Sequence, residues 1–198
     1  LLGDLDVEVS LDAQIGASTW FGIGGRADIL ACPRTESALI ELAVRCRDQG
    51  VPVRVLGGGA NLLVDDGGVD GVVVQLNHEH FKTIRYTANG DITSARVGAG
   101  VNLFDLVQET KRRGLHGFEM MAGIPGTAGG GVRMNAGGAW GQLSDCLKTV
   151  SMVALDGTHH VFDAETLGFR YRGSDLPHGI ITECIISLQE DDPIKVSD

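Results

Sequence analysis

The residues of this chain best suited to chemistry are glycines, and they lie in four short stretches. The stretches are GIGG at 22–25, LGGGANLL at 56–63, GAG at 98–100, and a longer block at 123–141 that contains GIPGT and MNAGGAWG. Glycine-rich turns expose backbone N–H groups, which can surround phosphate oxygens without any cationic side chain. Ordinary turns explain any one stretch, but four together favour a ligand. The pattern therefore predicts a long ligand that contains a diphosphate.

Two other patterns offer alternatives. GAGVNL at 98–103 follows an expected strand and opens an expected helix, as the first half of a dinucleotide-binding fingerprint does, although the third glycine is missing. A Rossmann-type NAD-binding protein is therefore a competing hypothesis, whereas the absence of GK[ST] from the sequence excludes a P-loop. The HEH stretch at 78–80 and the histidine pair at 159–160 lack a third ligand at a diagnostic spacing, so no metal site is expected.

Composition excludes several classes of partner. The chain has 198 residues, 43% of them hydrophobic, and a formal net charge of -10, so a sizeable core is expected and nucleic acid and anionic membranes are poor partners. No apolar run approaches the ~18 residues of a membrane span, and the acidic start lacks the basic head of a signal peptide. The four cysteines show no CxxC spacing and have apolar neighbours. Reduced thiols and a soluble, cytoplasmic protein are therefore expected.

A β-α-β unit is expected around the second glycine stretch. Three elements make it up: a helix within 35–50, and strands within 51–59 and 71–76. Leu39, Leu42 and Cys46 share one face of the helix. Thr35 is the expected N-cap, and Gly50 follows the helix end. A β-α-β unit fits this alternation of helix and strands.

The second half of the chain predicts a different arrangement. Its expected elements are a strand at 92–100, a helix at 102–114, a hairpin at 149–162 turned at Asp156-Gly157, and a last strand at 179–190. Asn102 is the expected N-cap of the helix, and Leu103, Leu106 and Val107 face inward. A hairpin in place of a further helix indicates antiparallel pairing, so the chain divides into two parts.

Five motifs, in this order and approximate spacing, resemble the UDP-N-acetylenolpyruvoylglucosamine reductase (MurB) family: STWFGIGGRAD, VLGGGANLLVDDGGVDGVVV, VGAGVNLFDLV, GFEMMAGIPGTAGGGVRMNAGGAWG and FRYRGSD. The match covers nearly all of the chain, and GIPGT joined to MNAG is a specific combination. The resemblance implies an α+β, two-subdomain FAD-binding fold of the vanillyl-alcohol-oxidase (PCMH) type. The change of pattern near residues 77–80 divides the chain into subdomains 1–79 and 80–198, and the resemblance implies a C-terminal substrate-binding domain after them that is not present in this chain.

The resemblance also implies which residues bind FAD, which this family holds without a covalent bond. The diphosphate would lie along Leu56, Gly57, Gly58, Gly59, Ala60, Asn61 and Leu62. The flavin would lie against Gly123, Ile124, Pro125, Gly126, Thr127, Gly129, Gly130, Asn135, Ala136 and Gly137. Trp20 and Trp140 are expected to pack at the rim of the cofactor, and Met120 and Met121 to fill the core.

By the same resemblance, the chemistry is the NADPH-dependent reduction of UDP-N-acetylglucosamine enolpyruvate to UDP-N-acetylmuramate in peptidoglycan precursor synthesis. FAD would take hydride from NADPH and deliver it to the enolpyruvyl double bond of this nucleotide sugar. Arg172 would stabilise the enolate-like intermediate as the catalytic cation, and Tyr171 beside it would flank the same substrate pocket. Spacing alone favours a surface ion pair between Arg172 and Asp175, whereas the motif context favours the catalytic role. The pattern does not predict an oligomeric state.

This sequence also departs from the family pattern. The family usually has a cation where Gly22 stands and a serine where Ala60 stands, so one charge and one hydroxyl near the cofactor are absent. The family's proton donor, a serine in a GSxFxNP-type motif, and its partner glutamate have no counterpart before Asp198. We therefore expect this chain alone to bind FAD without turning over the substrate. The alternative is a non-catalytic flavin- or nucleotide-binding module that lacks the third domain.

Overall fold

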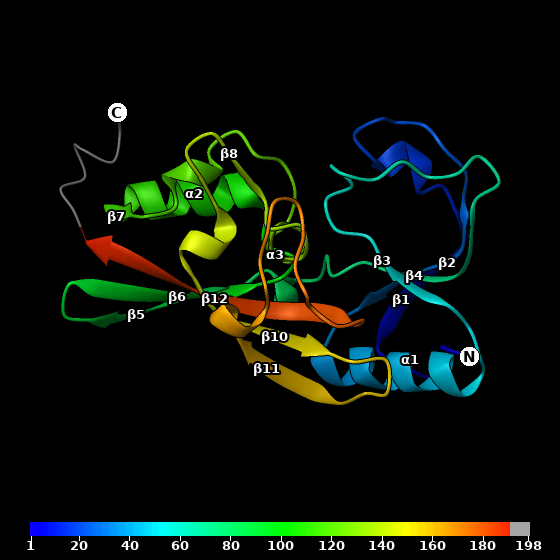
Figure 1. The fold of residues 1–198 in the computed structure, drawn as a ribbon. Coiled ribbons are helices and arrows are strands. Elements are labelled where there is room, and N and C mark those ends of the chain that lie inside the picture. Colours follow the sequence, from blue (N-terminus) through cyan, green and yellow to red (C-terminus); the bar gives the residue numbers. More distant parts are fainter. Residues whose placement is uncertain (191–198) are drawn as a thin grey trace.

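A four-stranded sheet forms the N-terminal lobe, which comprises β1 to β4 (Figure 1). The computed structural model describes residues 1–190. The strands are β1 (Val7–Ala13), β2 (Ala27–Pro33), β3 (Val53–Val55) and β4 (Val69–Val74), in the order β1-β2-β4-β3. β1 pairs antiparallel with β2, whereas β2, β4 and β3 are parallel. Helix α1 (Glu36–Asp48) connects β2 to β3, so a β-α-β unit is present. The two expected strands are β3 and β4, whereas the first strand of the unit, β2, was not expected.

The sequence of α1 explains both its ends and its buried face. Thr35 Oγ1 accepts a hydrogen bond of 3.2 Å from the N–H of Ala38, which satisfies one free donor of the first turn. Leu39, Leu42 and Cys46 are fully buried against the sheet, as their spacing predicts. Gly50, just beyond the helix, has a φ of 66°. This left-handed conformation favours glycine and ends the helix.

An antiparallel sheet forms the C-terminal lobe, which comprises β5 to β12, in the order β11-β10-β12-β6-β5 with β7 paired to β12. Its strands are β5 (Ile84–Asn89), β6 (Ile92–Gly98), β7 (Leu115–His116), β10 (Leu147–Val153), β11 (His159–Asp163) and β12 (Ile180–Glu190). A separate small ladder joins β8 (Gly137–Gly138) to β9 (Gly141–Gln142). Helices α2 (Leu103–Arg112) and α3 (Ala128–Arg133) lie together on one side of the large sheet (Figure 1).

The predicted elements of this lobe are confirmed. Asn102 caps α2 through a 2.8 Å hydrogen bond from the N–H of Phe104, and Leu103 and Leu106 are buried beneath the helix. The hairpin of β10 and β11 turns at the expected residues, and the last strand, β12, lies in the centre of the sheet. The subdomain boundary predicted between residues 79 and 80 falls in the connection from β4 to β5, within a short 3-10 helix, η2 (Glu79–Phe81).

The Rossmann alternative is wrong, because β6, which precedes GAG, pairs antiparallel with both β5 and β12. These glycines serve close packing instead. A Cβ on Gly98 would lie 2.2 Å from the carbonyl oxygen of Phe81, and one on Gly100 would lie 1.9 Å from that of Leu76. The chain that leaves β4 therefore presses on the end of β6 at a distance that only glycine permits.

The Gly100→Ala variant should consequently be less stable than the wild type by about 3 kcal/mol, because the contact is with backbone that cannot rotate away. Denaturant unfolding followed by circular dichroism measures this loss. Gly138→Ala is the matched control, since a Cβ there meets no atom within 4 Å. Equal midpoints for the two variants would contradict the packing role of Gly100.

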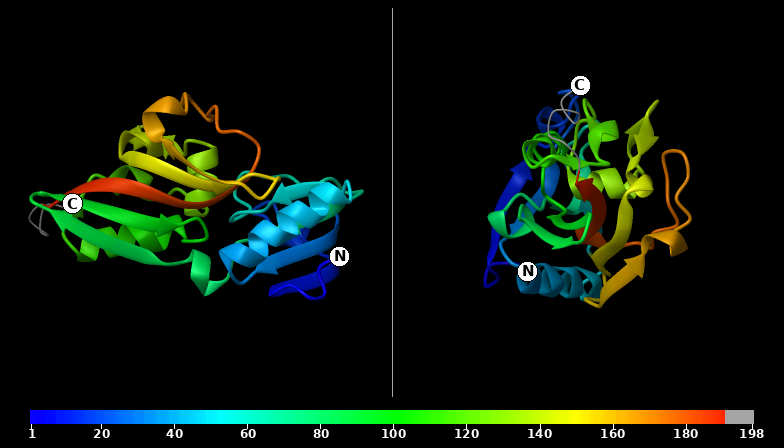
Figure 2. Two further views of the ribbon diagram at one scale, coloured as in Figure 1. Left: turned by 90° about the horizontal axis from the view of Figure 1, so that it is seen from below. Right: turned by 90° about the vertical axis from the view of Figure 1, so that its left-hand side faces the viewer.

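The two lobes touch at the β10–β11 hairpin, among other places, and share one core. The turn between β10 and β11 reaches α1, where Arg47 donates a 3.3 Å hydrogen bond to the carbonyl of Asp156 and a Cβ on Gly157 would lie 2.6 Å from Val44 (Figure 2). Buried side chains of both lobes, such as Leu42 and Met152, belong to a single hydrophobic cluster. The relative position of the lobes is therefore set by packing as well as by the connecting chain.

None of the helices in the described part of the chain has the length and hydropathy of a membrane-spanning segment. Met121 is fully buried and Met120 packs against the core, as expected for filler. All four cysteines are free and buried.

Candidate functional site

Two glycine loops, one from each lobe, meet at the centre of the molecule. We call residues 57–61, which follow β3, the first glycine loop, and residues 123–127, which precede α3, the second glycine loop. A Cβ on Gly58 would lie 2.8 Å from the Cα of Gly126, and a Cβ on Gly57 would lie 2.9 Å from Thr127 Oγ1. The stretches that the sequence analysis assigned to diphosphate and flavin are therefore in direct contact.

Both loops present free backbone donors. Within the described residues, the N–H groups of 57–61 donate to no protein acceptor, and the same holds for those of Gly123, Gly126 and Thr127. Gly123 and Gly126 have φ values of 78° and 125°, and a Cβ on either would project into open space. A run of unpaired amides beside an open surface is suited to phosphate oxygens, so the residues present fit a dinucleotide such as FAD.

Other predicted cofactor residues have their amides engaged within the protein. The N–H of Leu56 donates to Val74, that of Gly129 to Ala99, that of Gly130 to Thr127 Oγ1 and that of Ala136 to Gly131. A Cβ on Gly129 would also lie 2.8 Å from that of Ala99, so this glycine permits α3 to pack on the end of β6. These four amides cannot serve a phosphate, and the roles of their residues at a cofactor stay predictions.

Asn135 connects three segments. The residue is almost fully buried, and its backbone has a φ of 41°. Its side-chain amide donates hydrogen bonds to Gln142 Oε1 at 2.9 Å and to the carbonyl of Arg170 at 3.2 Å. Its own oxygen accepts one of 3.1 Å from the N–H of Ser144. The side chain is thus occupied inside the protein. Asn135 therefore fixes the backbone around the small β8–β9 ladder and around Arg170.

Tyr171 and Arg172 form the tip of a tight turn. Arg170 and Gly173 exchange backbone hydrogen bonds of 3.0 and 3.1 Å, and Arg172 has a φ of 56°, which is uncommon for a residue other than glycine. Both tip side chains are exposed, and the Arg172 guanidinium lies 5.5 Å from the centre of the Tyr171 ring. The turn therefore presents a cation and an aromatic ring together to the outside.

The ion pair between Arg172 and Asp175 that spacing favours does not form. Asp175 pairs with Arg170 instead, through Arg170 Nη1 and Asp175 Oδ1. Arg172 has no carboxylate partner within residues 1–190. Arg170 lies at the base of the turn, whereas Arg172 lies at its tip with a left-handed φ. With no carboxylate partner among these residues, the exposed Arg172 guanidinium can bind an anion.

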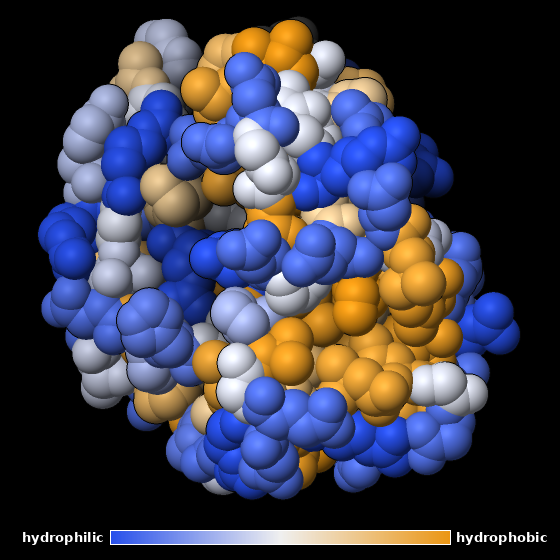
Figure 3. All heavy atoms as spheres, turned by 90° about the vertical axis from the view of Figure 1, so that its right-hand side faces the viewer, coloured by the Kyte–Doolittle hydropathy of each residue, from blue (hydrophilic) through white to orange (hydrophobic). Residues whose placement is uncertain are grey.

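Trp20 and Trp140, which were expected at the rim of the cofactor, are 69% and 90% exposed, and their contact with a cofactor stays a prediction. Both lie on loops, where no neighbouring element covers them. Other large hydrophobic residues that are exposed in the N-terminal lobe include Phe21, Ile23, Leu62 and Leu63. Figure 3 looks onto the N-terminal lobe and shows hydrophobic side chains gathered between charged ones on this end of the molecule.

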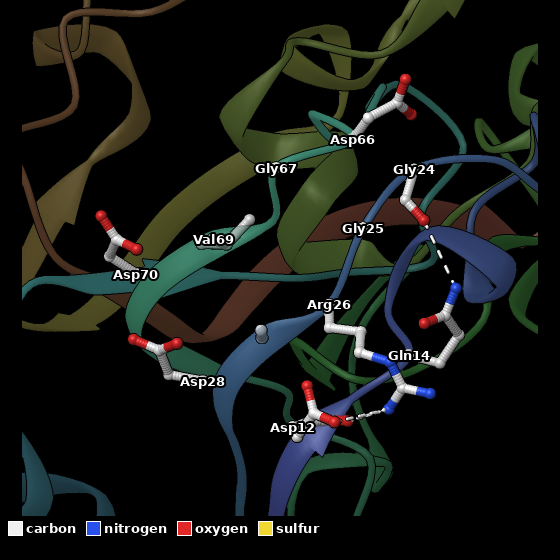
Figure 4. Close-up of a pocket in the computed structure, with 11 residues that line it drawn as sticks. Asp12, Gln14, Gly24, Gly25, Arg26, Asp28, Asp66, Gly67, Val69 and Asp70 are labelled. Atoms are coloured by element: carbon white, nitrogen blue, oxygen red, sulfur yellow. Dashed lines mark hydrogen bonds and ion pairs between the residues drawn. The ribbon is translucent and has the colours of Figure 1, made fainter.

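An acidic hollow of about 470 Å³ lies elsewhere in the N-terminal lobe (Figure 4). Its lining includes four carboxylates, those of Asp12, Asp28, Asp66 and Asp70. Arg26 is turned toward Asp12, with 3.1 Å between Nη1 and Oδ2, and the other carboxylates point in different directions. Negative charge makes this hollow unsuited to a diphosphate. Among the described residues, no group of three metal-ligating side chains converges here or elsewhere.

The cysteines offer no tether for a cofactor. Burial raises the pKa of the Cys146 thiol to about 12, and it raises the pKa values of Cys32, Cys46 and Cys184 as well. Burial disfavours the charged thiolate, which is the nucleophilic form. These thiols are therefore unreactive at neutral pH.

Two lobes, one with a mixed sheet and one with an antiparallel sheet, and two glycine loops that meet between them define an α+β FAD-binding fold of the vanillyl-alcohol-oxidase type. The chain belongs to the FAD binding domain family, whose model matches residues 27–163. The expected fold class is thereby confirmed, and FAD is the cofactor of the family.

Similar proteins indicate a particular group of flavoenzymes within this family. UDP-N-acetylenolpyruvoylglucosamine reductase from Enterococcus faecalis is 35% identical over 93% of this chain, and the enzyme of the same name from Desulfosudis oleivorans is 41% identical over 83%. The crystal structure of UDP-N-acetylenolpyruvylglucosamine reductase (MurB) from Thermus caldophilus superimposes with a TM-score of 0.78 at 38% identity over 96% of this chain. The resemblance to the MurB family is therefore confirmed.

The likeness covers only part of these proteins. The chain spans 60% of the Enterococcus reductase, 52% of the Desulfosudis reductase and 65% of the Thermus chain. The matched part is the FAD-binding part, since the family model for that domain lies within it.

Proposed function

We propose that this chain is the FAD-binding part of a reductase that converts UDP-N-acetylglucosamine enolpyruvate to UDP-N-acetylmuramate with NADPH, in the cytoplasm. The observation that carries the proposal is the contact between the two glycine loops, which present unpaired backbone amides to the outside. The similarity of the sequence to MurB reductases supports it. The free, buried cysteines are typical of a reducing compartment.

The first glycine loop would hold the diphosphate, and the second would lie against the flavin. A chain of net charge -10 repels phosphate, so neutral backbone donors are the means available to bind it. Ala60 supplies no hydroxyl and Gly22 no cation, so the binding would depend more on the backbone amides. FAD, when bound, supplies the transfer of hydride between NADPH and the enolpyruvyl group.

Arg172 and Tyr171 would act on the substrate. The enolpyruvyl group carries a carboxylate, and addition of hydride to its double bond develops further negative charge next to that carboxylate. The Arg172 guanidinium has no carboxylate partner within residues 1–190 and lies on a hydrogen-bonded turn, so it can stabilise this charge without breaking an ion pair among those residues. Tyr171 would limit the direction from which the substrate approaches.

The direct test is an assay of the complete product of the gene. NADPH oxidation, followed at the nicotinamide absorbance, should depend on UDP-N-acetylglucosamine enolpyruvate and on FAD together. Oxidation that proceeds at the same rate without the nucleotide sugar would reject the proposed substrate.

Flavin binding should be non-covalent. Burial raises the pKa values of the cysteine thiols, so these offer no thiolate for attachment to the flavin at neutral pH. We expect that protein reconstituted with FAD shows flavin absorbance, gains thermal stability, and releases all its flavin into the supernatant after denaturation and precipitation. Flavin that remains with the precipitate would contradict this prediction, and so would the absence of both absorbance and thermal shift.

A further inference from the structure

Arg133, the last residue of α3, is a half-buried cation whose partners are all carbonyl oxygens. Its guanidinium donates to the carbonyls of Leu176 at 3.1 Å, Pro177 at 3.0 Å and Gly179 at 3.0 Å. No carboxylate pairs with it in the described part of the chain, and burial lowers its pKa. Burial of a charge costs free energy, which hydrogen bonds to that charge must offset.

The segment that Arg133 binds has no regular structure of its own. Residues 174–179 lie between the turn of Tyr171 and Arg172 and the start of β12, and they belong to neither helix nor strand. Their carbonyls have no sheet partners to satisfy them. The planar guanidinium supplies several donors in a fixed arrangement, which a lysine cannot match. The Arg133 guanidinium therefore satisfies carbonyl oxygens of this segment that would be satisfied by a neighbouring strand in a sheet.

The same end of α3 also holds the other side of the turn. Ser174 Oγ donates a 3.3 Å hydrogen bond to the carbonyl of Arg133, and Asn135 donates one to the carbonyl of Arg170. The opposite end of α3 begins at Thr127, in the second glycine loop. Because α3 is only six residues long, it forms a short rigid connection between this loop and the turn.

We propose that Arg133 is a positioning residue that sets the place of the Tyr171–Arg172 turn relative to the second glycine loop. The role of the turn in reduction rests on the function proposed above, whereas the contacts of Arg133 are observed independently of that function. Loss of its donors should release the turn and segment 174–179 while the core of the lobe stays folded, since Val132 and Ala128 remain buried.

Limited proteolysis tests the placement without any substrate. Trypsin cleaves after arginine, and the turn contains Arg170 and Arg172. In Arg133→Met, which keeps the stem but no donor, cleavage there should be about tenfold faster than in the wild type, with Arg133→Lys in between. Arg112→Met, which alters an exposed arginine on α2, is the control and should match the wild type. Wild-type cleavage rates in Arg133→Met would overturn the proposal, provided that circular dichroism confirms folding of every variant.

Kinetics of the complete gene product separates positioning from general stability. Arg133→Met should raise the KM for the nucleotide sugar and lower kcat, each about tenfold, while the dissociation constant for FAD stays within a factor of about two. Partial recovery in Arg133→Lys is expected. Parallel loss of FAD affinity and activity would overturn the positioning role. If the wild type reduces no enolpyruvyl substrate, the proposed function fails, and the proteolysis comparison still decides the role of Arg133.

Discussion

The Arg172→Ala variant of the complete gene product should reduce the enolpyruvyl nucleotide sugar about 10²–10³ times more slowly than the wild type, with unchanged flavin content. The reason is that Arg172 is exposed at the tip of a hydrogen-bonded turn and has no carboxylate partner within residues 1–190. On the proposed function, its removal deletes a charge that serves the transition state, and it breaks no ion pair among residues 1–190. Steady-state kinetics and the ratio of flavin to protein absorbance measure the two quantities.

Two further variants control this result. Arg172→Lys keeps the charge without the planar donors, so we expect partial activity. Arg112→Ala removes an exposed arginine that pairs with Glu109 on α2, and it should behave as the wild type does. An Arg172→Ala enzyme with normal kcat and KM would show that another cation serves the substrate carboxylate.

The Gly58→Ala variant should bind FAD about 100-fold more weakly than the wild type, which corresponds to ~2.7 kcal/mol. The added Cβ would lie 2.8 Å from the Cα of Gly126 and would push the two glycine loops apart. Because Gly58 is exposed, the fold should tolerate this shift, and the unfolding midpoint should change little.

Fluorescence titration with FAD gives the affinity, and Gly138→Ala is the matched control because a Cβ there meets nothing within 4 Å. If Gly58→Ala and Gly138→Ala bind FAD equally well, the contact between the loops does not shape the binding site.

Elements with their own local signals could be predicted from sequence. The cap at Thr35 and the spacing of Leu39 and Leu42 specify α1, and Asp156-Gly157 specifies the hairpin. Strands β1 and β2 were missed. The alternation of Val7, Val9 and Leu11 was a usable signal for β1, but two of these three side chains are exposed in the structure, so the pattern does not mark a buried face.

The functions of individual glycines could not be separated from sequence. Gly58 and Gly100 stand in similar strings, yet Gly58 borders a row of free amides while Gly100 allows a backbone contact inside the lobe. The difference lies in which distant segment approaches each glycine, and residues close in sequence do not encode it. The pairing of Asp175 with Arg170 rather than Arg172 likewise depends on a left-handed residue within the turn.

The central claim is that two glycine loops of different lobes together bind one flavin dinucleotide through backbone amides. Calorimetric titration of the purified protein with FAD and, separately, with FMN tests it most directly. FMN carries one phosphate and no adenylate, so it would leave most donors of the first loop unsatisfied. We predict one FAD per chain and an affinity for FMN at least about 100-fold lower. Equal affinity for the two flavins, or no binding of either, would contradict the account.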